Sequence, residues 1–148
     1  MESKKLIWAL AMAQAMIFSG VAQAQQPAAL TPRVVSEPYE VAQGTFLNLT
    51  LERVDPDYVS AMLYENVYDD YENVAIPRGS RLFGRQVNRV NDSHDVYFTQ
   101  LQLSSTGQTL TLDPPLQATS PLGAAGLTNF KPAAIAGTIW RKDQVMPH

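Results

Sequence analysis

The sequence contains no cysteine among its 148 residues, so it has no disulfides, no thiolate metal site and no lipid-modified cysteine. Any core must therefore hold by packing alone. Basic residues are not in excess either: 11 Lys and Arg stand against 14 Asp and Glu, a net charge of −3. Without a basic surplus to hold phosphates, we expect no direct nucleic-acid binding. The length predicts a single domain with a modest core.

Residues typical of active sites are scarce. There are two histidines, and His148 is the last residue. His94 lies beside Asp95 in the polar stretch "VNDSHD", which predicts an exposed turn, and no Ser or Cys occupies a recognisable nucleophile elbow. We therefore expect no enzymatic activity and no cofactor. A hydrolase that uses His94 is an alternative, and it would require activity that His94→Ala abolishes.

No apolar run reaches the ~20 residues that a membrane-spanning helix needs. The longest, "LIWALAMAQAMIFSGV", follows two lysines and precedes "AQA", with small residues at Ala22 and Ala24. This order predicts a signal peptide over 1–24, cleavage before Gln25 and a periplasmic location. An uncleaved inner-membrane anchor is the alternative. Residues 25–38 hold three prolines, which predicts an extended arm.

From about Tyr39 onward, apolar and polar residues alternate with period two, which is typical of half-buried strands. The first run, 45–54, directs Leu47, Leu49 and Leu51 to one side. A second run over 61–69 is predicted to be a strand, although its first residues also favour a helix.

Two further runs, 95–103 and 109–115, predict a hairpin around the turn "SSTGQ". In the first of them, Tyr97, Thr99, Leu101 and Leu103 would share one face. Pro114 and Pro115 are expected to end the second strand, because proline cannot donate to a sheet ladder.

The stretch "ENVYDDYENVAIPRGSRLFGRQV" predicts another hairpin. Pro77 suits the second position of a turn, and Gly79 suits a left-handed position that closes it. This turn would pair residues 73–76 with 80–90. Gly84 inside the second strand predicts a bend or a close backbone approach.

An acidic cluster precedes this turn, at Asp69, Asp70 and Glu72. Its spacing lacks the alternating oxygen ligands and central glycine of a calcium loop, so no metal site is expected. We expect instead a solvated loop whose acids pair loosely with Arg78, Arg81 and Arg85.

Together these patterns predict an all-β, mostly antiparallel domain, either barrel-like or a sandwich, over 39–118. The Gly/Ala/Pro-rich tail over 119–148 is predicted to supply a last strand around 135–140 or to order against a partner. A sheet of about six short strands is not expected to close on itself, which would leave an edge for a neighbouring subunit.

Several stretches resemble, in the right order over residues 40–130, the VirB/TrbI-like channel-scaffold family of type IV secretion and conjugation systems. That family shows a Gly-Thr pair, a Val-Tyr-Asp, an Ile-Pro-x-Gly-Ser/Thr-x-Leu-x-Gly and a Gly-x-x-Gly-Leu. The matching residues are Gly44, Thr45, Val67, Tyr68, Asp69, Ile76, Pro77, Gly79, Ser80, Leu82, Gly84, Gly123, Gly126 and Leu127.

The resemblance implies a non-catalytic β-barrel-like subunit of a core complex at the outer membrane. It also implies a homo-oligomeric ring and two kinds of partner, a small lipoprotein and a periplasmic β-domain subunit. No apolar two-helix hairpin follows the motif, so we expect a reduced version of the domain.

A different class stays open: an independent periplasmic β-rich module that binds a peptide, a glycan or an inhibitor target. Covered sheet edges and a monomeric state would favour that module. Unpaired edges that need a neighbour would favour the scaffold.

Overall fold

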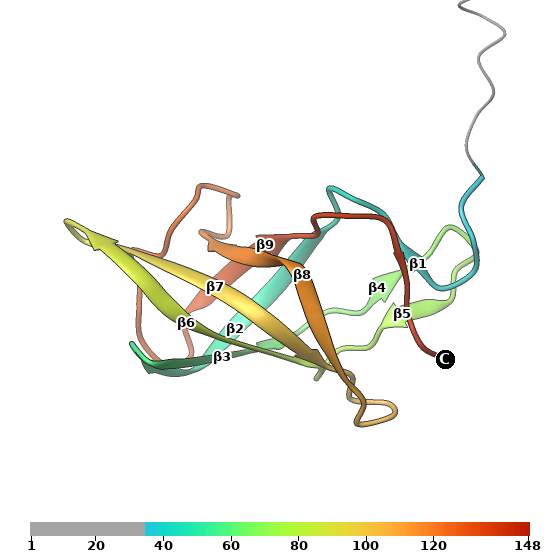
Figure 1. Cartoon of the computed structure of the whole chain (residues 1–148), viewed down its shortest axis with the longest axis horizontal. Coiled ribbons are helices and arrows are strands. Elements are labelled where there is room, and N and C mark those ends of the chain that lie inside the picture. Colours follow the sequence, from blue (N-terminus) through green and yellow to red (C-terminus); the bar gives the residue numbers. More distant parts are fainter. Residues whose placement is uncertain (1–34) are drawn as a thin grey trace, which may run out of the picture. The chain divides into compact units, whose positions relative to one another are not determined.

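The computed structural model describes residues 35–148, of which 36–148 form a compact unit. The predicted signal peptide 1–24 and most of the predicted arm 25–38 lie outside the described residues. The prediction of an all-β antiparallel fold is confirmed, and the barrel-like form is the one adopted: six strands close in the order β2-β3-β6-β7-β8-β9 (Figure 1). The barrel strands are β2 (Phe46–Asp55), β3 (Tyr58–Leu63), β6 (Arg81–Val90), β7 (Ser93–Gln102), β8 (Thr109–Thr119) and β9 (Ile135–Ile139).

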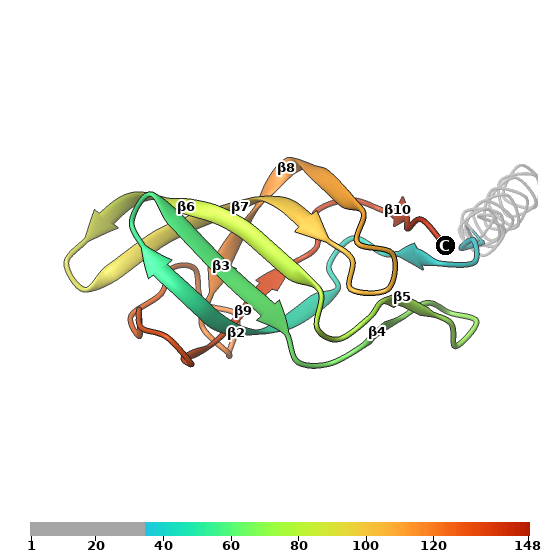
Figure 2. The same ribbon diagram turned by 90° about the horizontal axis from the view of Figure 1, so that it is seen from below.

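Two short ribbons stand outside the barrel sheet. β1 (Glu40–Val41) pairs with β10 (Gln144–Val145), and β4 (Val67–Tyr68) pairs with β5 (Val74–Ile76). Figures 1 and 2 both place these ribbons at the end of the barrel opposite the β6–β7 turn. The four additional strands therefore extend one end of the barrel.

The barrel interior is filled by aliphatic side chains at alternate strand positions, as the period-two pattern predicts. In β2, Leu47, Leu49 and Leu51 are buried, which confirms their predicted common face. The interior continues beneath the ribbons, where Trp140 and Met146 are among the largest buried side chains. One core therefore supports both the barrel and its ribbons.

The prediction that Tyr97 and Thr99 share a face of β7 with Leu101 and Leu103 is wrong, because the inward face changes in the middle of the strand. Val96 and Phe98 are buried as expected for one face, but the next buried residues are Leu101 and Leu103. The β7–β8 register shifts between Phe98 and Gln100, which marks an irregularity in the ladder. A bulge exchanges the inward and outward side chains of the residues that follow it in the strand. The alternation of apolar and polar residues alone does not reveal where a bulge lies.

The prediction that the sheet stays open is also wrong. β9 comes from the Gly/Ala/Pro-rich tail and lies between β2 and β8, which closes the barrel. Gly137 in β9 lets the tip of the Phe46 ring approach the strand, since a Cβ there would be 2.2 Å from the ring atom Cζ. The tail is therefore part of the fold, and its removal would open the barrel.

Pro114 and Pro115 do not end β8, which continues to Thr119. The β7–β8 register passes from Gln100↔Thr111 directly to Phe98↔Leu116, so residues 112–115 have no partner on β7. Prolines are tolerated in such a bulge because no ladder N–H is required of them.

Gly84 marks a close backbone approach, as predicted. It lies opposite Phe98 beside a register shift in the β6–β7 ladder. A Cβ on Gly84 would stand 2.0 Å from the carbonyl oxygen of Tyr97. Because that neighbour is backbone, a side chain at position 84 would force the two strands apart.

We therefore expect Gly84→Ala to lower the free energy of unfolding by about 3 kcal/mol, as overpacking at a rigid contact does. Urea denaturation followed by far-UV circular dichroism would measure this. Gly107→Ala is the matched control: its φ is +72° and a Cβ there meets nothing within 4 Å, so only backbone strain of roughly 1–2 kcal/mol is added. Equal losses from the two variants would contradict the close approach.

Candidate functional site

The stretch with the clearest motif forms a hairpin that differs from the predicted one. The run 61–69 is not one strand, because β3 ends at Leu63 and β4 begins at Val67. β5 pairs with β4 through Val67↔Ile76 and not with β6, which pairs with β3 and β7. The acidic cluster is thus the turn of the hairpin, and the Pro77–Gly79 turn leads from it into the barrel.

The predicted left-handed conformation of Gly79 is present, with φ at +87°. Its N–H donates to the carbonyl of Leu63 at 2.7 Å, and the N–H of Leu63 donates to the carbonyl of Ser80 at 2.8 Å. The buried Ser80 hydroxyl accepts the N–H of Ser104 at 3.1 Å. These contacts fasten the base of the β4–β5 hairpin to the ends of β3 and β7.

Asp69 organises the tip of the hairpin and is buried, contrary to the predicted solvated loop, whereas Asp70 and Glu72 are exposed as predicted. Its Oδ1 accepts the N–H groups of Tyr71 and Asn73, each at 2.8 Å. Its Oδ2 accepts the N–H of Tyr39 at 2.5 Å and the side-chain amide of Asn73 at 3.0 Å. Burial alone would raise the pKa of Asp69, but the hydrogen bonds from Tyr39, Asn73 and Tyr71 outweigh it and lower the pKa to about 2.

The expected pairing of this cluster with arginines is wrong. Within residues 35–148 the ion pairs are Arg81–Glu52, at 2.9 Å, and Arg53–Asp55, at 2.8 Å. The Asp70 carboxylate accepts a hydrogen bond from the Ser36 hydroxyl instead. Asp69 and Asp70 therefore bind backbone, amide and hydroxyl groups.

Through Tyr39, Asp69 also fixes both ends of the compact unit. Tyr39 has a φ of +64°, which is unusual for a residue with a side chain. Its carbonyl accepts the N–H of Met146 at 2.8 Å, and its ring stacks on His148 with centroids 3.9 Å apart. We call Tyr39, Asp69, Met146 and His148 the terminal junction. Neither the local pattern at Tyr39 nor that at His148 indicated this role.

The outer side of the hairpin is aromatic. Tyr68 is 58% exposed and lies opposite Val74, which is 36% exposed. Tyr71 at the tip is 50% exposed, and its hydroxyl donates to the carbonyl of Ser36 at 2.7 Å. β4 and β5 form a two-stranded sheet, so each has one edge without a strand partner among the described residues.

The downstream motif forms the β8–β9 loop, which folds back over the barrel. Gly123 and Gly126 have φ values of +91° and +88°, and Leu127 is buried. Leu127 exchanges backbone hydrogen bonds with His94 at 2.8 and 2.9 Å. The positive φ values explain why glycine suits both positions.

The prediction of an exposed turn at His94 is therefore wrong. His94 belongs to β7 and is partly buried, and its ring stacks on Phe130 with centroids 4.4 Å apart. Its Nδ1 lies 2.7 Å from the Oε1 of Gln86. The ring thus helps to hold the β8–β9 loop against the barrel.

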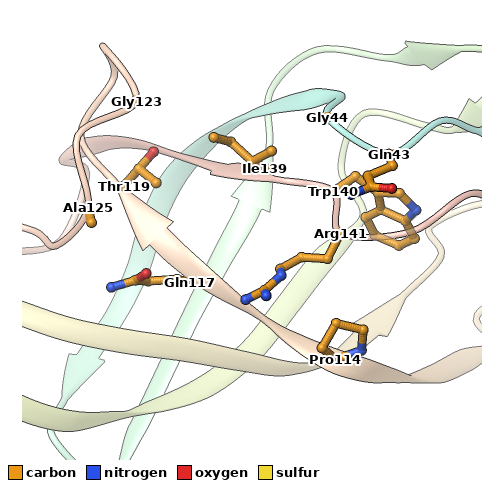
Figure 3. Close-up of a pocket in the computed structure, with 10 residues that line it drawn as sticks. All are labelled: Gln43, Gly44, Pro114, Gln117, Thr119, Gly123, Ala125, Ile139, Trp140 and Arg141. Carbon is orange, nitrogen blue, oxygen red and sulfur yellow. The ribbon is translucent and has the colours of Figure 1, made fainter.

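A surface hollow of about 400 Å³ lies between β8 and the end of β9 (Figure 3). Two of the motif residues, Gly44 and Gly123, line it. The other lining residues are Gln43, Pro114, Gln117, Thr119, Ala125, Ile139, Trp140 and Arg141. Gly44 and Thr45 also hold Trp140 in place, since both backbone groups of Trp140 bond to them at 2.8 Å. No single sequence motif indicated this hollow, because its residues come from four separate segments.

The motif residues therefore fall into two regions. Val67, Tyr68, Asp69, Ile76, Pro77, Gly79 and Ser80 build the hairpin and its base, while Leu82 and Gly84 continue into β6. Gly44, Thr45, Gly123, Gly126 and Leu127 lie around the hollow and the β8–β9 loop.

Within residues 35–148, no group of three or more His, Asp or Glu side chains could hold a metal ion. The same residues include no helix long and apolar enough to cross a membrane. No family model matches the chain, and no curated protein matches it either.

We expect Asp69→Asn to destabilise the hairpin and the terminal junction together. In asparagine an NH₂ group replaces one of the two carboxylate oxygens. Whichever oxygen it replaces, at least one N–H of Tyr39, Tyr71 or Asn73 then faces a donor and loses its acceptor. The melting temperature should fall by several degrees, measured by differential scanning fluorimetry. Asp92→Asn is the matched control, since Asp92 is exposed in the β6–β7 turn. An equal, small shift for both would contradict the organising role of Asp69.

The pKa of Asp69 also predicts a dependence on pH. Its folded-state pKa of about 2 lies below the ordinary value of 3.8, so its stabilising effect is complete above pH 4. That effect should be lost as the pH falls from about 4 to about 2. The difference in melting temperature between the wild type and Asp69→Asn should therefore shrink over this window. A constant difference from pH 6 to pH 2 would show that the charge of Asp69 is not involved.

Proposed function

We propose that this protein is a structural, non-catalytic subunit of the envelope complex of a type IV secretion or conjugation apparatus. In this proposal it is exported to the periplasm and joins the outer-membrane core through a lipoprotein, a periplasmic β-domain subunit and further copies of itself. The ordered resemblance to the VirB/TrbI-like family supports the class. The β4–β5 hairpin supports assembly, and it is the observation that carries the proposal.

Three features of the hairpin suit a protein contact. Tyr68, Tyr71 and Val74 expose apolar surface, and tyrosine is enriched among the residues that dominate binding energy at interfaces. Each strand has an edge that could pair with a further strand. Asp69 and Ser80 hold the hairpin rigidly, which reduces the entropy lost on binding.

The closed barrel changes where an interface is expected. The scaffold hypothesis assumed that the main sheet stays open, but its six strands close into a barrel. The proposal therefore places the contact on the hairpin, outside the barrel.

Tyr68→Ser should reduce co-purification of the protein with other core subunits at least several-fold after mild detergent extraction and cross-linking, because a central aromatic contact is removed. Quantitative mass spectrometry of the purified complex would measure the loss. Val90→Ser is the matched control: Val90 is 55% exposed, close to the 58% of Tyr68, but belongs to the opposite end of the barrel. Its substitution should leave the complex intact.

A stable monomer from native cells, with no cross-linked partner and no loss of secretion or conjugation on gene deletion, would reject the scaffold proposal. Equal loss of partners in the Val90 and Tyr68 variants would reject the hairpin as the contact.

A second candidate function is an independent periplasmic binding module. The closed barrel favours it, because covered edges suit a protein that works alone. The hollow beside β9 would then be its ligand site. Normal secretion or conjugation in a deletion strain, together with a monomeric native protein, would favour this module.

A further inference from the structure

The contact between β8 and β9 is the shortest in the barrel. It has two residue pairs, Ala118↔Thr138 and Thr119↔Gly137, whereas the other neighbouring strands share between four and nine. On the N-terminal side of Ala118 in β8, and after Thr138 in β9, the two strands separate. The hollow of about 400 Å³ occupies the gap between them. This volume lies within the usual range of ligand sites.

The β9 side of the gap offers backbone groups for a further strand. Trp140 directs its N–H to the carbonyl of Thr45 and its carbonyl to the N–H of Gly44, both at 2.8 Å and both toward the start of β2. Successive residues of an antiparallel strand direct these groups to alternate sides. Ile139, the last residue of β9, therefore directs its backbone groups toward β8 and the gap. Across it, the carbonyl of Gln117 accepts the hydroxyl of Thr138 at 2.7 Å.

The side chains around the gap favour an acidic ligand with an apolar residue. Arg141 extends from the end of β9 toward β8, between Pro114 and Gln117 (Figure 3). It forms no ion pair with any residue in the described part of the chain, and none of the residues that line the hollow is acidic. Ile139, 41% exposed, supplies apolar surface beside it.

We propose that this hollow binds an extended peptide segment of a partner protein. The segment adds as a strand beside the end of β9, at Ile139, and places a carboxylate against the guanidinium of Arg141. A strand is favoured over a compact small molecule because backbone groups on one wall are directed into the gap, and strand addition uses such groups for affinity. The proposal is independent of the secretion role, since either candidate function could use it.

An array of random-sequence octapeptides would test the proposal with the purified mature protein. One arm carries free C-termini and the other carries amidated C-termini, which distinguishes a chain-end carboxylate from an acidic side chain. We expect the selected peptides to carry an acidic group from one of these two sources. In fluorescence polarisation, Arg141→Gln should weaken their binding about tenfold, the effect of losing a hydrogen bond to a charged group.

Three controls keep the outcome clear. Lys142→Gln removes the neighbouring cation, which does not line the hollow, and should leave affinity unchanged. N-methylation of alternate peptide N–H groups should abolish binding if a strand is added. Tyr68→Ser should have no effect, which separates failure of this site from failure of the hairpin interface. Absence of selected peptides, selection without acidic groups, or equal binding by the Arg141 and Lys142 variants would overturn the proposal.

Discussion

The position of β9 between β2 and β8 is the constraint on which the remaining structure depends. It converts a curved five-stranded sheet into a closed barrel and brings Trp140 into the core. The five residues of β9 pair along their whole length with β2, but two pairs join them to β8. The barrel is therefore closed firmly on one side of β9 and loosely on the other, and the hollow with Arg141 is the consequence.

A second set of contacts holds the ribbons at one end of the barrel. The Asp69 carboxylate binds the turn of the β4–β5 hairpin and the backbone of Tyr39, and Tyr39 in turn contacts Met146 and His148. One buried charge thus joins three segments that are far apart in the sequence. Such a charge is tolerated because four hydrogen bonds replace its hydration.

These two constraints separate the surfaces on which function is proposed. The hairpin with Tyr68 lies outside the barrel sheet and offers aromatic area and free edges. The hollow lies between two barrel strands and offers a cation and backbone groups. A structural subunit could use the first for stable assembly and the second for a separate peptide ligand, and single substitutions can test each surface independently.

The sequence alone determined the all-β antiparallel class, the inward face of β2, the left-handed turn at Gly79 and the close approach at Gly84, because each depends on local periodicity or on backbone freedom at one residue. Tertiary structure decided the pairing of β5 with β4, the passage of β8 through its prolines and the burial of Asp69. It also decided that β9 closes the barrel. These features depend on register and on contacts between segments distant in the chain, and a single bulge is enough to reverse the pattern from which faces are predicted.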